Sequence, residues 1–139
     1  MTTSRISDWP TAFDAFIESK KLLPFSWGTH DCIMFATAVI EAITGNDPAR
    51  TWRGQYATAL GAARIFKKFG GFEEMICKVA ADHGFQEQSL SLAQRGDLVL
   101  QNGKWPTAGV CCGKLSAFTD AKSLIFVPTQ SCSKSWRIN

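Results

Sequence analysis

The hydrophobic pattern of this chain changes at Gly96, and this change constrains the fold more than any other feature. Before Gly96, apolar residues recur at the three- and four-residue spacings of helices. After it, they gather in short runs rich in Val, Leu, Ile and Phe, which are typical of strands. Helices followed by strands indicate the α+β class. Because 139 residues can bury one core, and no repeat or linker interrupts them, we expect a single domain over residues 1–139.

Four helices are expected in the first part of the chain, over residues 7–20, 31–44, 57–69 and 72–83. Pro10 marks the first turn of the first helix, and Gly45, Gly70 and Gly84 end the others. The helix over 31–44 is apolar on most of its faces. It is therefore expected to be the central buried helix.

Five strands are expected after Gly96, over residues 97–100, 109–112, 115–118, 124–127 and 136–138. The intervals between them are mostly short and contain turn residues such as Asn102-Gly103 and Gly113. Such intervals predict hairpin connections and therefore an antiparallel sheet. The N-terminal helices are expected to pack on this C-terminal sheet.

Charge and hydropathy exclude several classes of protein. The formal charge is only +3, and the basic residues are scattered, so no nucleic-acid partner is expected. The longest apolar stretch, 33–43, is too short to cross a bilayer, and the N-terminus lacks the pattern of a signal peptide. We therefore expect a chain made in the cytoplasm, with no membrane span.

The cysteines fit neither a disulfide scaffold nor a zinc ribbon, because the chain has five of them and their spacing is not paired. The neighbours Cys111 and Cys112 should point to opposite faces of a strand, so that only one of them faces the core. With only two histidines in the chain, no metal site is expected, and no cofactor motif is present.

Cys32 is the candidate for chemistry. A tight loop, Phe25 to Asp31, leads directly into the apolar helix, so Cys32 lies in its first turn. Free backbone N–H groups and the helix dipole favour a thiolate there, which is the nucleophile that acyl transfer requires. The same N–H groups could stabilise an oxyanion. The alternative is that Cys32 is a small hydrophobic residue at the start of a core helix.

Two motifs carry a resemblance to a known family. The stretch Trp27-Gly28-x-x-Asp31-Cys32 resembles the Asp-Cys nucleophile motif of NlpC-type cell-wall peptidases, and Arg95-Gly96-Asp97-Leu98-Val99 resembles the Gly-Asp-Leu-Val strand that follows it. The resemblance covers residues 25–112 and implies a papain-like fold. More narrowly, the chain is similar to an uncharacterised branch encoded by phages and prophages, often near tail genes. This similarity implies incorporation in a virion, at the tail tip, with other tail proteins as partners.

The chain departs from the family at the catalytic base. Active members begin the next strand with His-Val-Gly-Ile, whereas this chain has Thr107-Ala108-Gly109-Val110. A threonine hydroxyl cannot accept a proton near neutral pH, so Thr107 cannot replace the histidine. The third member of the family triad would fall near Ser116 or Thr119, where it has no imidazole to orient.

Two histidines could in principle supply the missing base. His30 lies two residues before Cys32, and its side chain is expected to leave the helix start in another direction. It is nevertheless retained as a candidate base. His83 precedes Gly84 and is expected to cap the end of its helix.

The tryptophans are expected mainly as core or interface anchors, although Trp27 and Trp105 could flank a groove beside Cys32. Gly28 and Asp31 complete the groove candidates. Three functions follow as hypotheses. The first is a virion assembly protein on a peptidase scaffold without its base. The second is an active amidase or endopeptidase on peptidoglycan stem peptides, and the third is acyl chemistry on another substrate.

Overall fold

The computed structural model describes residues 3–139 and has the expected α+β architecture, in which four helices precede a six-stranded antiparallel sheet over these residues. The helices are α1 (Trp9–Lys20), α2 (Cys32–Thr44), α3 (Ala59–Lys68) and α4 (Phe72–His83). The strands are β1 (Gln86–Gln88), β2 (Leu98–Asn102), β3 (Pro106–Cys111), β4 (Leu115–Phe118), β5 (Ile125–Pro128) and β6 (Lys134–Arg137). There are also two single 3₁₀ turns, η1 (Leu90–Leu92) and η2 (Thr129–Ser131).

All four predicted helices are confirmed, with ends within two residues of those expected. The ends of α2 show why. Asp31 caps its start, because the Asp31 side chain accepts a hydrogen bond from the Met34 backbone N–H. Gly45 ends it in the left-handed conformation, with φ of 79°, and donates its N–H to the Glu41 carbonyl.

The sheet has the strand order β1-β6-β2-β3-β4-β5, and every pairing is antiparallel. The hairpins joining β2 to β5 are confirmed. The last connection is not a hairpin, because β6 crosses back to lie between β2 and β1. Strand β1 was not expected from the sequence, since its three residues, Gln-Glu-Gln, lack any apolar alternation.

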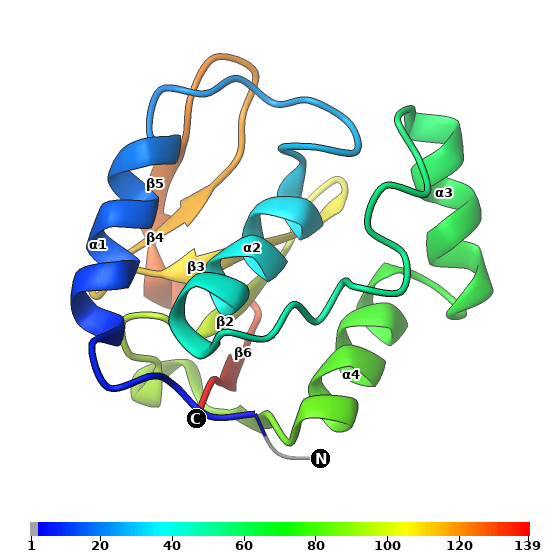
Figure 1. Cartoon of the computed structure of the whole chain (residues 1–139). Coiled ribbons are helices and arrows are strands. Elements are labelled where there is room, and N and C mark those ends of the chain that lie inside the picture. The colour runs from blue at the N-terminus through cyan, green and yellow to red at the C-terminus, as the bar shows by residue number, and fades with distance from the viewer. Residues whose placement is uncertain (1–2) are drawn as a thin grey trace.

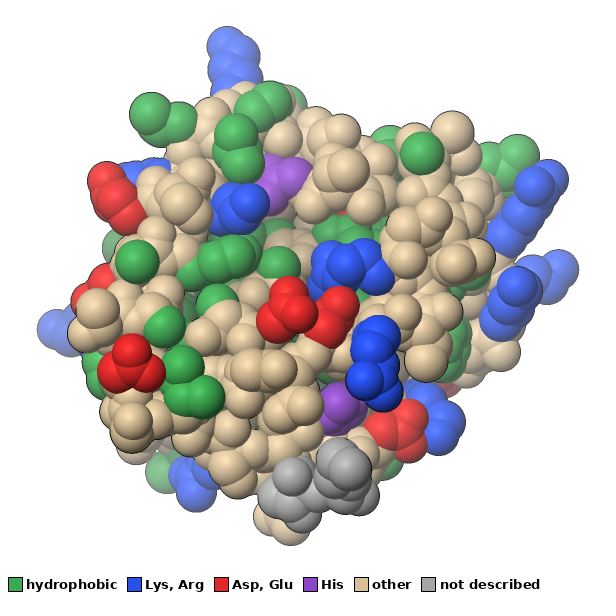
Figure 2. All heavy atoms as spheres, viewed as in Figure 1, with side chains coloured by type: hydrophobic (Ala, Val, Ile, Leu, Met, Phe, Trp, Pro, Cys, Tyr) green, Lys and Arg blue, Asp and Glu red, His purple; other side chains and the backbone are tan. Residues whose placement is uncertain are grey.

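The helices cover one face of the sheet. In Figure 1, α1 and α2 lie across the near face, α4 lies beside β6, and α3 stands farthest from α1. The main core lies between α2 and the strands and includes Met34, Val39, Leu100 and Val110, all fully buried. Charged side chains of both signs are interspersed over the face in Figure 2.

A smaller cluster lies on the opposite face of the sheet. It contains Val99, Cys111, Phe118 and Cys132, with Leu90 of η1 packed against it. The expected alternation of the two neighbouring cysteines is confirmed, because Cys112 packs against the main core instead. Only Cys112 therefore faces the main core, while Cys111 is buried in the smaller cluster on the other face of the sheet.

The Gly-Asp-Leu-Val motif has a structural role, which is carried by Asp97. Its buried carboxylate accepts hydrogen bonds from the Arg5 guanidinium and the Ile138 N–H on one oxygen, at 2.8 and 3.0 Å. The other oxygen accepts from the Gln88 side chain and the Gln94 N–H, at 2.8 and 2.9 Å. Asp97 thus joins the N-terminal segment to β1 and to the residue after β6.

The described helices are short. The longest of them, α2, has 13 residues. Among the described residues, none forms a helix with the length and apolar character needed to cross a bilayer.

Candidate functional site

Asp31 holds the loop that presents Cys32. Its carboxylate is fully buried and accepts three hydrogen bonds, from the Met34 N–H at 2.9 Å, the Gly28 N–H at 2.9 Å and the Tyr56 hydroxyl at 2.7 Å. Burial, followed by the bond to Asp31, raises the pKa of the Tyr56 phenol, so Tyr56 remains a donor. We call Asp31, Gly28 and Tyr56 the Asp31 clamp.

Only glycine fits at position 28 of this clamp. Gly28 has a φ of 85°, and a Cβ atom built there would lie 2.2 Å from the Tyr56 carbonyl oxygen. The expectation that Asp31 lines a groove is wrong, because its side chain is fully buried. Gly28 is half-buried and is not among the residues that line the hollow beside Cys32.

A hollow of about 520 Å³ opens beside Cys32, and we call it the Cys32 hollow. Five aromatic side chains line it: Phe25, Trp27, Phe66, Phe72 and Trp105. The other lining residues are Cys32, Ala59, Pro106, Thr107 and Thr119. The hollow thus has aromatic walls contributed by the loop before α2, by α3 and α4, and by the β2–β3 turn.

Trp27 and Trp105 belong to this hollow and not to the core. Trp27 is 38% exposed and Trp105 is 74% exposed, whereas Trp52 and Trp136 are buried. The prediction of core or interface anchors is thus confirmed as core for Trp52 and Trp136, whereas Trp27 and Trp105 lie outside the core. The groove alternative holds for Trp27 and Trp105, because both line the hollow together with Cys32.

Cys32 is the first residue of α2 and is half-buried. Burial raises the pKa of its thiol above the ordinary value of 9.0. The backbone of Ala108, the hydroxyl of Thr107 and the backbone of Ile33 favour the thiolate, but they do not offset burial. Cys32 is therefore a protonated thiol at neutral pH.

Thr107 lies beside Cys32, as the alignment of motifs predicts. Both residues line the same hollow, and the Thr107 hydroxyl is among the groups that act on the Cys32 pKa. Among the described residues that line this hollow, Cys32 is the only one with an ionisable side chain. No lining residue can take a proton from the thiol near neutral pH.

His30 does not line the hollow. Its side chain is buried, its ring packs edge-on against Phe35 with centroids 5.7 Å apart, and its Nε2 has no hydrogen-bond partner among the described residues. Burial, and secondarily Lys20, lower the pKa of His30, so its ring is neutral at pH 7.

The remaining candidates, His83, Ser116 and Thr119, lie in three different places. His83 is in the last turn of α4, where its Nδ1 lies 2.7 Å from the Thr3 hydroxyl and its ring stacks on Phe85. Ser116 is buried and bonds the Thr129 hydroxyl at 2.7 Å, away from the hollow. Of the two positions expected for a third triad member, only Thr119 lines the hollow.

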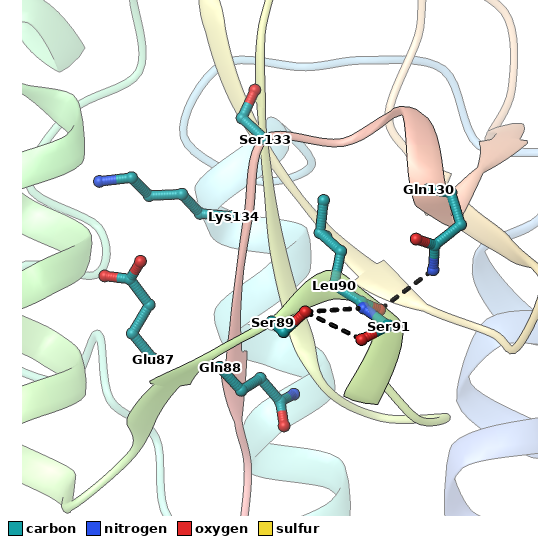
Figure 3. A pocket seen from close by; sticks show the side chains of 8 residues that line it. All are labelled: Glu87, Gln88, Ser89, Leu90, Ser91, Gln130, Ser133 and Lys134. Atoms are coloured by element: carbon teal, nitrogen blue, oxygen red, sulfur yellow. Dashed lines mark hydrogen bonds between the residues drawn. The ribbon is translucent and has the colours of Figure 1, made fainter.

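A second hollow of about 520 Å³ is polar and offers no comparable chemistry. Figure 3 shows Glu87 and Lys134 on one side of it and Ser91 and Gln130 on the other. Its hydroxyls bond each other, since Ser89 Oγ lies 2.9 Å from Ser91 Oγ. Lys134 is paired with Glu73 at 2.6 Å. Within residues 3–139, no group of three or more His, Cys, Asp or Glu side chains is placed to hold a metal ion.

Sequence reasoning missed Tyr56 and the aromatic walls. Tyr56 is the only tyrosine in the chain and lies in the loop after α2, but no local pattern connects it to Asp31, 25 residues earlier. Phe66 and Phe72 have the spacing of ordinary helical core residues. Their edge-to-face contact, with centroids 5.0 Å apart, arises only when α3 and α4 pack together.

The fold and the site together define an α+β domain with a cysteine at the head of its buried helix, open to an aromatic hollow. The chain belongs to the family described as "Domain of unknown function (DUF6950)", whose model matches residues 4–138. Neither a curated protein nor a solved structure matches the chain.

Proposed function

We propose that this chain is a phage or prophage virion protein of the tail tip, with a structural role in assembly and a degenerate NlpC-like, papain-like fold. The papain-like assignment is supported by the position of Cys32 at the head of α2 and by its contact with β3 at Thr107 and Ala108. These are the positions at which the resemblance aligns the nucleophile and the base. The virion role is supported by the similarity to the branch found near tail genes.

One observation carries the proposal of a scaffold without activity. None of the described residues that line the Cys32 hollow can act as a general base, since Thr107 occupies the position aligned with histidine. Acyl transfer by a cysteine needs a thiolate or a base that generates one. Burial also raises the pKa of the Cys32 thiol, so a thiolate is disfavoured near neutral pH.

The alternative is an active amidase or endopeptidase that cleaves peptidoglycan stem peptides with Cys32 as the nucleophile. It is favoured by one observation, the opening of the hollow at the first turn of α2, where backbone N–H groups can stabilise an oxyanion. In this case His30 would have to turn its ring from Phe35 toward the thiol. The buried Nε2 without a partner is the atom that would gain a hydrogen bond by doing so.

Alkylation with iodoacetamide, followed by mass spectrometry, separates the two functions. Cys77 is an exposed thiol on α4 and serves as the internal reference. For the scaffold, Cys32 labels no faster than Cys77 at pH 6, and its rate rises about tenfold per pH unit and is still rising at pH 9. Rapid labelling of Cys32 alone at pH 6 would support the peptidase.

A genetic test addresses the virion role. In a phage or prophage that encodes this chain, Cys32→Ala is expected to leave the amount of the protein in purified particles and the infectivity per particle unchanged. Intact particles that lose infectivity with this variant would contradict the scaffold and support the enzyme. Particles that lack the wild-type chain altogether would contradict the virion role itself.

A further inference from the structure

We infer that the Cys32 hollow binds an aromatic side chain presented by a partner polypeptide. This inference rests on the proposed assembly role and names the chemistry of the contact. It goes beyond that role because it assigns a ligand class to the surface where a peptidase would bind its substrate.

The walls of the hollow are selective for flat rings. Phe25 and Trp27 pack edge-to-face with centroids 4.8 Å apart, and Phe66 and Phe72 form a second such pair at 5.0 Å. Trp105 and Pro106 add two further flat surfaces. Aromatic rings gain a geometry-dependent contact with other rings in addition to the burial of their area.

Size and exposure leave room for an inserted aromatic side chain. A volume of about 520 Å³ lies within the range of small-ligand sites, which is roughly 300–1,000 Å³. Trp105, at 74% exposure, leaves most of a large apolar side chain in contact with water. A partner that covered this ring would remove it from water, which is how aromatic anchors contribute at protein interfaces.

The same walls disfavour two other occupants. Peptidoglycan stem peptides carry carboxylates, and no described Lys, Arg or His side chain lines the hollow to pair with one, so burying that charge is unfavourable. A lipid acyl chain would contact aliphatic walls best, whereas no described Leu, Ile or Val lines the hollow. The aromatic side chain of a polypeptide fits both observations.

The experiment is a titration of the ¹⁵N-labelled full chain by NMR. The probes are three capped tripeptides, acetyl-Gly-Trp-Gly-amide and its Leu and Glu counterparts. The Trp peptide is expected to give saturable shifts of the Trp27 and Trp105 indole N–H signals. The Leu peptide should bind about three- to tenfold more weakly, and the Glu peptide more weakly still.

Trp105→Ala is expected to weaken binding of the Trp peptide about three- to tenfold. Leu22→Ala is the matched control, because Leu22 is similarly exposed, at 83%, but lies outside the hollow. The amide spectrum of each variant reports its folding in the same experiment. Binding that survives Trp105→Ala unchanged, absence of saturable shifts, or equal binding of the Leu or Glu peptide would each overturn the inference.

Failure of this inference differs from failure of the proposed function. If the Trp peptide does not bind while Cys32→Ala particles remain intact and infectious, the assembly role stands and only the aromatic contact is wrong. If Cys32 labels rapidly at pH 6, the scaffold proposal fails whatever the peptides do. Preference for the Glu peptide together with rapid labelling would make the hollow a substrate site.

Discussion

Replacing Tyr56 with phenylalanine tests the clamp that positions Cys32. The change removes only the hydroxyl that donates to the buried Asp31 carboxylate at 2.7 Å and leaves the ring in place. A hydrogen bond to a charged group contributes about 1.5–3 kcal/mol. Two backbone donors, Gly28 and Met34, still serve the carboxylate. The free energy of unfolding is therefore expected to fall by about 2 kcal/mol.

Asp31→Ala should lower the free energy of unfolding more than Tyr56→Phe does, because it removes all three hydrogen bonds to the carboxylate. Loss of the helix cap costs about 1 kcal/mol, and a buried hydroxyl left without a partner costs about 1–3 kcal/mol more. With the loss of the charge-assisted bond, a total of about 3–5 kcal/mol is expected. The double variant Asp31→Ala/Tyr56→Phe should lose about 1.5–3 kcal/mol less free energy of unfolding than the sum of the two single losses, because both changes remove the same hydrogen bond.

Urea unfolding followed by circular dichroism measures these differences. Lys78→Ala is the control, because its ion pair with Asp82 is exposed and spans one helical turn, so its removal should change stability by no more than about 0.5 kcal/mol. A Tyr56→Phe variant as stable as that control would refute the reasoning. The carboxylate would then be satisfied without Tyr56, and the placement of Cys32 would not depend on the loop after α2.

Two further substitutions test the site. Gly28→Ala should lower the free energy of unfolding by more than about 2 kcal/mol. Gly45→Ala should lower it by only about 1–2 kcal/mol, because Gly45 also has a positive φ but no atom lies within 4 Å of the new Cβ. Equal losses in urea unfolding would contradict the close approach at Gly28. Thr107→His should place an imidazole beside Cys32 and raise its alkylation rate at pH 7 about tenfold or more. If Thr119→His gave the same increase, position 107 would have no special relation to the thiol.

The helices were predictable because their signals are local. Asp31 and Gly45 bracket α2 in the sequence as they do in the structure, through a side-chain cap and a left-handed turn. The strands β2 to β5 follow one another through short turns, so their order followed from the same local reasoning.

The exceptions depend on distant residues. Strand β1 is polar and exists because its residues pair with β6, about 50 positions later. The insertion of β6 between β1 and β2 is likewise fixed by contacts that no local pattern encodes, such as the bond from Ser133 N–H to the Leu100 carbonyl.

The candidate site divides in the same way. Cys32 and Thr107 could be paired from the sequence, because a resemblance aligned two motifs more than 70 residues apart, and the structure places both in one hollow. Phe66 and Phe72 could not be assigned to that hollow, since their spacing is the same whether a helix faces a core or a cavity. The tertiary packing of α3 and α4 decides between these two environments.

The motif residues have structural reasons to be present whether or not the chain is an enzyme. Asp31 caps α2, Gly28 admits the Tyr56 carbonyl, and Asp97 joins both ends of the chain. A scaffold that lost its activity would therefore keep these glycine and aspartate positions, because changing them would cost stability. Thr107 differs, since it is half-buried at the hollow and carries no comparable network. The residue at position 107, more than the Asp-Cys motif, would accordingly distinguish a peptidase from a scaffold.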